Sequence, residues 1–261
     1  MEEKEQQMLL LAQALPAVAA QLRATLANMH AALSAGDEPG ACILRQSYYR
    51  MLRTVTNLTD AAMLADDTPL PKQDVDLVIL VDELCRQAQP LAEACGLTLR
   101  VDIRPRHLVV GINPTYTQRL LWNLLSNAMK FTPPGGTIEV SLRTGPECVL
   151  LCVKDSGPGI PQDKLERLFD RWQHSNMDLP VHGLGLGLPL CRRIAQGHGG
   201  SLVVSSRKGE GTAVTVRLPD RRSGVTLVRQ PLFHYTGGFN PVLVELADAL
   251  PVQAFTRNYI D

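Results

Sequence analysis

Two amides and an ammonium group stand at helical spacing in the segment 123–130, whose sequence is NLLSNAMK. At about 100° per residue, Asn123, Asn127 and Lys130 fall within roughly 60° of one another on one stripe of a helix. Amide oxygens suit a hard cation such as Mg²⁺, which proteins usually hold together with substrate phosphates. The lysine adds a positive charge for a phosphate oxygen. The stripe therefore indicates a magnesium-phosphate site, although a polar helix face is more often simply solvated.

Two glycine-rich segments follow this stripe. Residues 155–160, DSGPGI, come directly after the apolar run 149–153, and residues 183–188, GLGLGL, come directly before a helical pattern. Glycine lets a backbone approach a ligand closely, and a helix that starts at Leu186 would point free N–H groups at an anion. Either segment alone could be an ordinary turn. A dinucleotide-binding fold is the poorer alternative, because its glycines should follow a strand and here they follow a polar loop.

The order of five motifs resembles the ATP-binding domain of sensor histidine kinases, in the superfamily that includes DNA gyrase B subunits, mismatch-repair ATPases and heat-shock chaperones. The motifs are NLLSNAMKFT, DSGPGI, LFDRW, GLGLGL and GEGT, and the resemblance runs from about Val75 to Pro219. It implies an α/β sandwich with a mixed sheet and helices on one face, with ATP and Mg²⁺ as cofactors. The fold class expected for the whole chain is α+β.

The resemblance implies a role for individual residues. Asn127 should coordinate Mg²⁺, and Asp155 should accept the adenine amino group. Asn123 and Lys130 should lie against the triphosphate as the catalytic groups. The LFDRW motif resembles the start of the lid, the segment that covers ATP in this family. The other residues that the resemblance assigns to ATP binding, around the base and at the far end of the lid, are Gly157, Gly159, Ile160, Gly183, Gly185, Leu186, Gly187 and Thr212.

Asn123 discriminates within the superfamily. Members that split water carry a glutamate at this position, because activating water needs a general base. An amide cannot take that proton, so Asn123 favours phosphoryl transfer to a protein group, or nucleotide binding without rapid turnover. Asn113 and Pro114 supply a helix cap and a first helical residue, so we expect the helix to begin there.

These residues need an α/β framework to hold them. A polar and proline-rich stretch, residues 68–71, marks a linker before it. Apolar periodicity predicts a helix over residues 78–95, and a short strand after His107. The strands expected to form the sheet cover residues 97–103, 137–143, 148–153, 202–206 and 213–218.

Composition indicates an intracellular protein. The 261 residues carry 26 basic and 26 acidic groups, so the balance gives no reason to expect nucleic acid or an anionic membrane as partner. No apolar run approaches the roughly 20 residues needed to cross a bilayer. The acidic flank of the apolar opening stretch is wrong for a signal peptide. Six cysteines without metal or disulfide spacing are typical of reduced core thiols. We expect a cytoplasmic location without membrane insertion.

Residues 1–67 are predicted to form a helical hairpin. Apolar residues follow a 4–3 spacing from Leu11 to Leu33 and again from Leu44 to Ala65, and the segment between them breaks the helical pattern. Two such seams cannot both be buried within one hairpin, so a homodimeric four-helix bundle is the expected solution. A plain structural coiled coil is the alternative.

This hairpin resembles the dimerisation and phosphoacceptor domain of histidine kinases, with one change. Residues 20–26, AQLRATL, overlay the family pattern His-Glu-Leu-Arg-Thr-Pro-Leu. Ala20 replaces the phosphoaccepting histidine, and Gln21 replaces the acidic neighbour that would take its proton. Losing nucleophile and base together is difficult to reconcile with ordinary autophosphorylation. His30 lies about 15 Å further along the helix than Ala20 and is rotated from it by roughly 80°. We therefore favour a solvated helix residue over a substitute phosphoacceptor at His30.

Three domains follow from these boundaries: the hairpin, an ATP-binding domain over residues 72–219, and a C-terminal extension over residues 220–261. The extension holds too many apolar groups for a disordered tail, and a short helix is expected near Pro241 to Leu250. Docking of this helix on the ATP-binding domain is our first expectation, because it would otherwise leave an exposed apolar patch. Binding of a partner, or stabilisation of the dimer, is the second.

Two functions from different classes are compatible with the sequence. The first is an ATP-dependent protein kinase of the histidine kinase family, acting in two-component signalling with an unassigned acceptor or in trans, with a response regulator as its partner. The second is a degenerate nucleotide-sensing dimer that regulates a partner without phosphorylation. The loss of a histidine at Ala20 favours the second for the chain's own chemistry.

Overall fold

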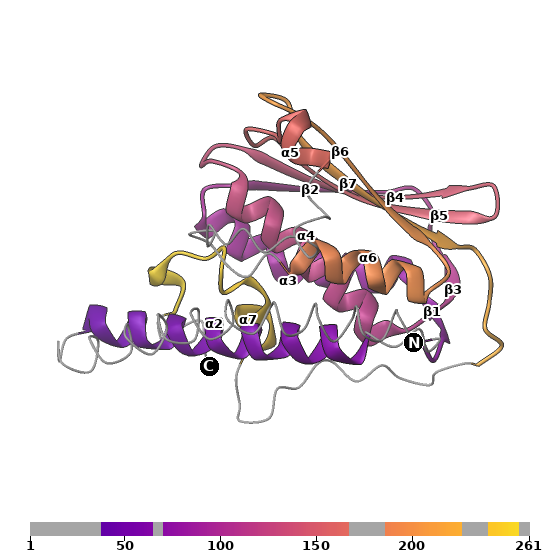
Figure 1. Cartoon of the computed structure of the whole chain (residues 1–261), viewed down its shortest axis with the longest axis horizontal. Coiled ribbons are helices and arrows are strands. Elements are labelled where there is room, and N and C mark those ends of the chain that lie inside the picture. Colours follow the sequence, from indigo (N-terminus) through magenta and orange to yellow (C-terminus); the bar gives the residue numbers. More distant parts are fainter. Residues whose placement is uncertain (1–37, 65–69, 167–185, 226–239, 256–261) are drawn as a thin grey trace.

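A computed structural model gives the fold, and Figure 1 shows its three layers. A five-stranded sheet forms one outer layer, a group of helices packs against one face of that sheet, and a long helix crosses the far side of the helix group. The structure describes residues 38–64, 70–166, 186–225 and 240–255.

Several predicted features lie outside the described residues. These are the first helix of the hairpin, with Ala20, Gln21 and His30, and the lid segment that contains Gly183 and Gly185. Among the helices that the structure does describe, none has the length and apolar character needed to cross a membrane.

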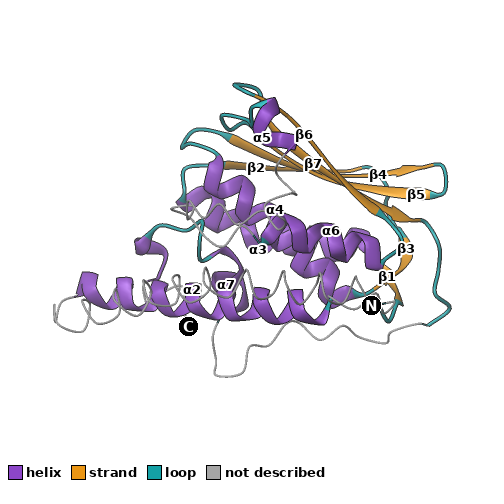
Figure 2. Cartoon of the chain, in the orientation of Figure 1, coloured by secondary structure: helices purple, strands orange, loops and turns teal. Residues whose placement is uncertain are grey.

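The strands are β1 (Gln73–Asp76), β2 (Thr98–Ile103), β3 (Val109–Ile112), β4 (Thr137–Gly145), β5 (Cys148–Asp155), β6 (Ser201–Arg207) and β7 (Gly211–Pro219). The main sheet has the order β2-β4-β5-β7-β6, in which β2 and β4 are parallel and the other neighbours are antiparallel (Figure 2). β1 and β3 form a separate antiparallel pair. The mixed sheet with helices on one face confirms the predicted α+β class, and each predicted strand of the main sheet ends within two residues of its expected bounds.

Three helices cover the sheet: α3 (Leu77–Ala94), α4 (Pro114–Phe131) and α6 (Gly187–Gly197). A short helix, α5 (Gln162–Glu166), follows β5. The α4 helix begins as its sequence predicts, because the Asn113 side chain accepts a hydrogen bond from the backbone N–H of Tyr116 and Pro114 occupies the first turn. This start determines the register of the polar stripe along α4.

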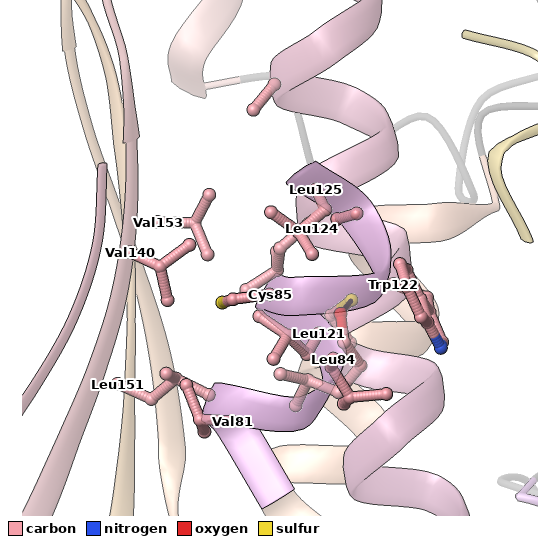
Figure 3. Packing of buried hydrophobic residues seen from close by; sticks show 14 of the residues in the cluster. Val81, Leu84, Cys85, Leu121, Trp122, Leu124, Leu125, Val140, Leu151 and Val153 are labelled. Carbon is pink, nitrogen blue, oxygen red and sulfur yellow. Dashed lines mark hydrogen bonds between the residues drawn. The ribbon is translucent and has the colours of Figure 1, made fainter. Parts of the chain in front are cut away.

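Much of the core lies between α3, α4 and the adjacent strands β4 and β5 (Figure 3). Leu121 and Leu125 of α4 and Val140 and Leu151 of the sheet are all buried. Side chains alternate along a strand, so one face of β4 and β5 supplies the apolar surface. Burial of each such leucine or valine contributes roughly 1.5–3 kcal/mol. The core therefore fixes α4 on the sheet and leaves its other face for polar contacts.

The outer face of the helix layer is covered by α2 (Glu38–Met63) and by α7 (Pro241–Leu246), which lies in the C-terminal extension. α7 contacts both α2 and α4, and its Leu243 and Leu246 side chains are buried. A 3₁₀ turn, Val252–Phe255, follows, and the Phe255 ring packs on Tyr49 of α2 with 5.4 Å between ring centroids. A helix from the end of the chain is thus enclosed between two earlier helices.

The two sides of α2 have different environments. Tyr48 and Val55, which belong to the predicted bundle seam, are 40% and 48% exposed. Tyr49, Arg53 and Asn57, which lie on the other side, are buried against the rest of the molecule. α2 therefore packs on the helix layer through a side that the seam pattern does not include.

The His198 side chain joins the end of α6 to the start of α4. Its Nε2 accepts a hydrogen bond from the backbone N–H of Asn113 at 2.8 Å, and Nδ1 lies 2.7 Å from the carbonyl oxygen of Ile194. Nε2 must be unprotonated to accept, so the ring is neutral and Nδ1 donates. Burial is the main reason that the pKa of His198 is lowered, and the nearby Lys72 ammonium lowers it further.

We expect the free energy of unfolding to depend on pH through His198. Because the pKa of His198 is lower in the folded protein, the unfolded chain binds the proton more readily. The contribution of His198 to the free energy of unfolding is therefore complete above about pH 6.5 and is lost as the pH falls below that value. The slope from one such group is at most about 1.4 kcal/mol per pH unit. Urea unfolding between pH 7.5 and 5 should show a flatter profile for His198→Gln, and parallel profiles would contradict the prediction.

Candidate nucleotide-binding site

The polar stripe of α4 meets the beginning of α6. Asn127 and Lys130 are half-buried, whereas Asn123 is fully buried. A β-carbon placed on Gly187 would lie 3.3 Å from Oδ1 of Asn123 and 3.6 Å from Nδ2 of Asn127. Both amides therefore lie against the first residue of α6, where any side chain would crowd them.

The start of α6 has the properties of an anion-binding helix end. Leu186 precedes the helix, and Pro189, which has no N–H, lies in the first turn. The remaining free N–H groups and the positive end of the helix dipole lie beside the two amides of α4. The glycine-rich segment and the amide stripe, separated by about sixty residues in the sequence, are therefore neighbours in space.

Asp155, at the end of β5, anchors a turn at the other end of the site. Its Oδ1 accepts hydrogen bonds from the backbone N–H groups of Gly157 at 2.8 Å and Thr212 at 3.3 Å. A β-carbon on Gly157 would lie 2.8 Å from the carbonyl oxygen of Phe131, the last residue of α4. The turn after Asp155 therefore contacts the end of α4, and Gly187 contacts the middle of the same helix.

The same turn is fastened to the β6–β7 hairpin. Ile160 donates its backbone N–H to Oγ of Ser206 at 2.7 Å, and this oxygen lies 2.9 Å from Oγ1 of Thr212. Gly159 has a φ of 67°, and a β-carbon there would lie 2.0 Å from the carbonyl oxygen of Arg207. Only glycine fits this position, because both the backbone conformation and the space exclude a side chain.

The electrostatics of Asp155 suit a ligand that donates a hydrogen bond. Burial raises the pKa of this carboxyl group, and the N–H groups of Gly157 and Thr212 lower it in part. Both hydrogen bonds that Asp155 accepts within the described residues go to Oδ1. Within the described residues the second oxygen therefore keeps its capacity to accept a hydrogen bond from a ligand.

Charged residues from outside the predicted motifs also reach α4. Burial is the main cause that lowers the pKa of Lys130, and the positive charges of Arg53 and Arg50 on α2 lower it further, while Asp248 in the C-terminal extension opposes the shift. Arg53 donates to Oδ1 of Asn123 at 3.3 Å and to Oγ of Ser126 at 2.6 Å. Sequence analysis missed Arg53, because the apolar pattern of α2 gives no signal for this side of the helix.

A second ionic cluster joins the same three segments. Arg119 of α4 is buried and pairs with Asp60 of α2 at 3.2 Å and with Glu245 of α7. Burial raises the pKa of Asp60, the Arg119 charge lowers it, and the nearby Glu245 raises it. The charge of Arg119 is therefore matched by carboxylates from α2 and α7.

Comparison with known proteins agrees with this geometry. Residues 112–222 match the family described as histidine kinase-, DNA gyrase B- and HSP90-like ATPase. The sensor histidine kinase TmoS of Ectopseudomonas mendocina is 33% identical over 68% of this chain, and the adaptive-response sensory kinase SasA of a Synechococcus strain is 32% identical over 67%. The chain spans only 18% and 47% of the lengths of these two relatives.

Solved structures share the fold. Histidine kinase ThkA in complex with response regulator protein TrrA superposes with a TM-score of 0.65 and 20% sequence identity, covering 84% of this chain and 64% of that one. Together with the family match and the sequence relatives, the arrangement of α4, α6 and the Asp155 turn identifies residues 112–222 as a histidine kinase-like ATPase domain. The predicted resemblance to sensor histidine kinases is thereby confirmed.

The tight packing of the turn that follows Asp155 can be tested by replacing each of two glycines with alanine. Gly159 and Gly209 both have positive φ, at 67° and 85°, but a β-carbon on Gly209 would meet nothing within 4 Å. Gly209→Ala should cost only the roughly 1–2 kcal/mol of the backbone conformation. Gly159→Ala should cost about 1–3 kcal/mol more because of the added clash. Chemical denaturation measures both, and equal losses would contradict the packing described for this turn.

Proposed function

We propose that this chain binds ATP with Mg²⁺ and acts in signal transduction as a member of the histidine kinase family. The observation that carries the proposal is the shared contact of α4 with both glycine-bearing segments, at Gly187 in its middle and Gly157 at its end. A purine with its amino group at Asp155 would direct its phosphates along α4 toward Lys130 and the start of α6. The chemistry of this path fits a nucleoside triphosphate.

Asn127 is the residue proposed to hold Mg²⁺. Its amide is half-exposed beside the start of α6, and amide oxygens are among the oxygen ligands that magnesium accepts together with phosphates. The ion would neutralise part of the triphosphate charge. Lys130 would neutralise another part, and its lowered pKa reflects burial that a bound phosphate would offset.

The site favours transfer or retention of the phosphoryl group over hydrolysis. Asn123 cannot act as a general base toward water, and its Nδ2 already donates to the carbonyl oxygen of Arg119 at 3.0 Å. A response-regulator-type protein is the proposed partner for transfer in trans. ThkA, which shares the fold, is recorded in complex with the response regulator TrrA.

A second function is favoured by the residues at the phosphoacceptor position. Ala20 and Gln21 replace the nucleophile and its base, which favours a nucleotide-sensing homodimer that regulates a partner without phosphorylation. The exposed Tyr48 and Val55 on α2 support the proposed dimer, because they leave an apolar seam available for a four-helix bundle.

Calorimetry with ATP and millimolar MgCl₂ tests the proposed site. The wild-type chain should bind ATP, and Asp155→Asn should weaken binding about 10- to 100-fold, because a hydrogen bond to a charged group contributes roughly 1.5–3 kcal/mol. Asp82→Asn, an exposed carboxylate on α3, is the matched control and should bind as the wild type does. Failure of the wild-type chain to bind ATP would sink the proposal.

Phosphorylation is tested by restoring the missing groups. The wild-type chain incubated with γ-labelled ATP should take up no acid-labile label, whereas the double variant Ala20→His with Gln21→Glu should gain it. Adding Asn127→Ala to the double variant should remove the label again. Label on a histidine of the wild-type chain, abolished by Asn127→Ala, would instead assign self-phosphorylation to this chain.

A further inference from the structure

Asn123 is completely covered in the docked arrangement of α2. The residue is 0% exposed, its Oδ1 accepts from Arg53, and its Nδ2 donates to the carbonyl oxygen of Arg119. The start of α6 closes the remaining side, where a β-carbon on Gly187 would lie 3.3 Å from Oδ1. A triphosphate therefore has no surface of Asn123 to contact while α2 is in this position.

Arg53 is held in place by several partners. The residue is 4% exposed, its side chain donates to Ser126 as well as Asn123, and its Nε lies 3.6 Å from Oδ2 of Asp248. The guanidinium group is thus engaged on its edges by protein atoms. Arg53 cannot follow a phosphate without giving up these contacts.

The backbone that carries Arg53 is also fixed. Asp60, two turns further along α2, pairs with Arg119, and Gln46, two turns earlier, donates to the carbonyl oxygen of Leu250 at 2.8 Å. Arg50 donates to the carbonyl oxygen of Ala247 at 3.2 Å. Contacts on both sides of Arg53 therefore mean that freeing Asn123 requires α2 to shift as a unit.

We propose that the contact of Arg53 with Asn123 and the contact of the triphosphate with Asn123 exclude each other, so that the docked α2 helix holds the nucleotide site in a weakly binding state. This inference rests on the proposed ATP site. The C-terminal extension sets the strength of the restraint, because Glu245, Asp248 and the carbonyl groups at Ala247 and Leu250 fasten α2 over α4.

Two consequences follow from linkage. The apparent affinity for ATP is reduced by the fraction of molecules in which α2 is displaced. In return, bound ATP must loosen α2 by the same factor. The nucleotide thus controls the position of the helix that also carries the apolar seam with Tyr48 and Val55.

Calorimetry on the full chain tests the exclusion. Arg53→Met should bind MgATP at least about threefold more tightly than the wild type, because the weakly binding state loses a stabilising contact. Arg86→Met removes the same charge from an exposed position on α3 and should bind as the wild type does. Unchanged or weaker binding by Arg53→Met, with normal binding by Arg86→Met, would overturn the inference.

Hydrogen exchange on the wild-type chain gives a test that needs no variant. Saturating MgATP should speed amide exchange in α2 between residues 46 and 60, although ligands usually slow exchange where they bind. Slower or unchanged exchange in α2 with ATP bound would overturn the inference while leaving the proposed ATP site intact. Absence of ATP binding to the wild-type chain would overturn the proposed function and the inference with it.

Discussion

The buried guanidinium group of Arg119 is the constraint on which the arrangement of the outer helices depends. Arginine keeps its charge in proteins, so a position that is only 5% exposed must be supplied with carboxylates. Asp60 comes from α2 and Glu245 from α7, which are far apart in the sequence. An ion pair of this kind adds little net stability over an apolar contact, but breaking it leaves an unmatched charge. Its effect is to specify where both segments lie on α4.

α4 consequently serves two purposes at once. One face, with Leu121 and Leu125, is part of the core and is fixed to the sheet. The other face carries the two amides that meet the glycine-opened start of α6, and one of them, Asn123, also accepts a hydrogen bond from Arg53 of α2. The proposed nucleotide site and the docking site for α2 therefore overlap at Asn123, and a change in either would alter the other without any long pathway between them.

The sequence predicted the parts of this structure that depend on local chemistry. The start of α4 at Asn113 and the strand bounds follow from capping and periodicity, which act over a few residues. The contact between Arg53 and Asn123 joins residues 70 positions apart. The 4–3 spacing of apolar residues in α2 does not predict this contact. The pairing of Glu245 with Arg119 was equally hidden, because buried charges are too uncommon for a pattern to anticipate them.

The tie between His198 and Asn113 has a mechanical consequence for the nucleotide end of the domain. It connects the last turn of α6 to the first residue of α4, whereas Gly187, at the opposite end of α6, touches α4 only near its middle. Any pivoting of α6 is therefore smallest at the imidazole and grows with distance from it. The tie therefore restrains α6 most strongly at its last turn and least at Gly187, where the spacing between α6 and the two carboxamides is set by local packing instead.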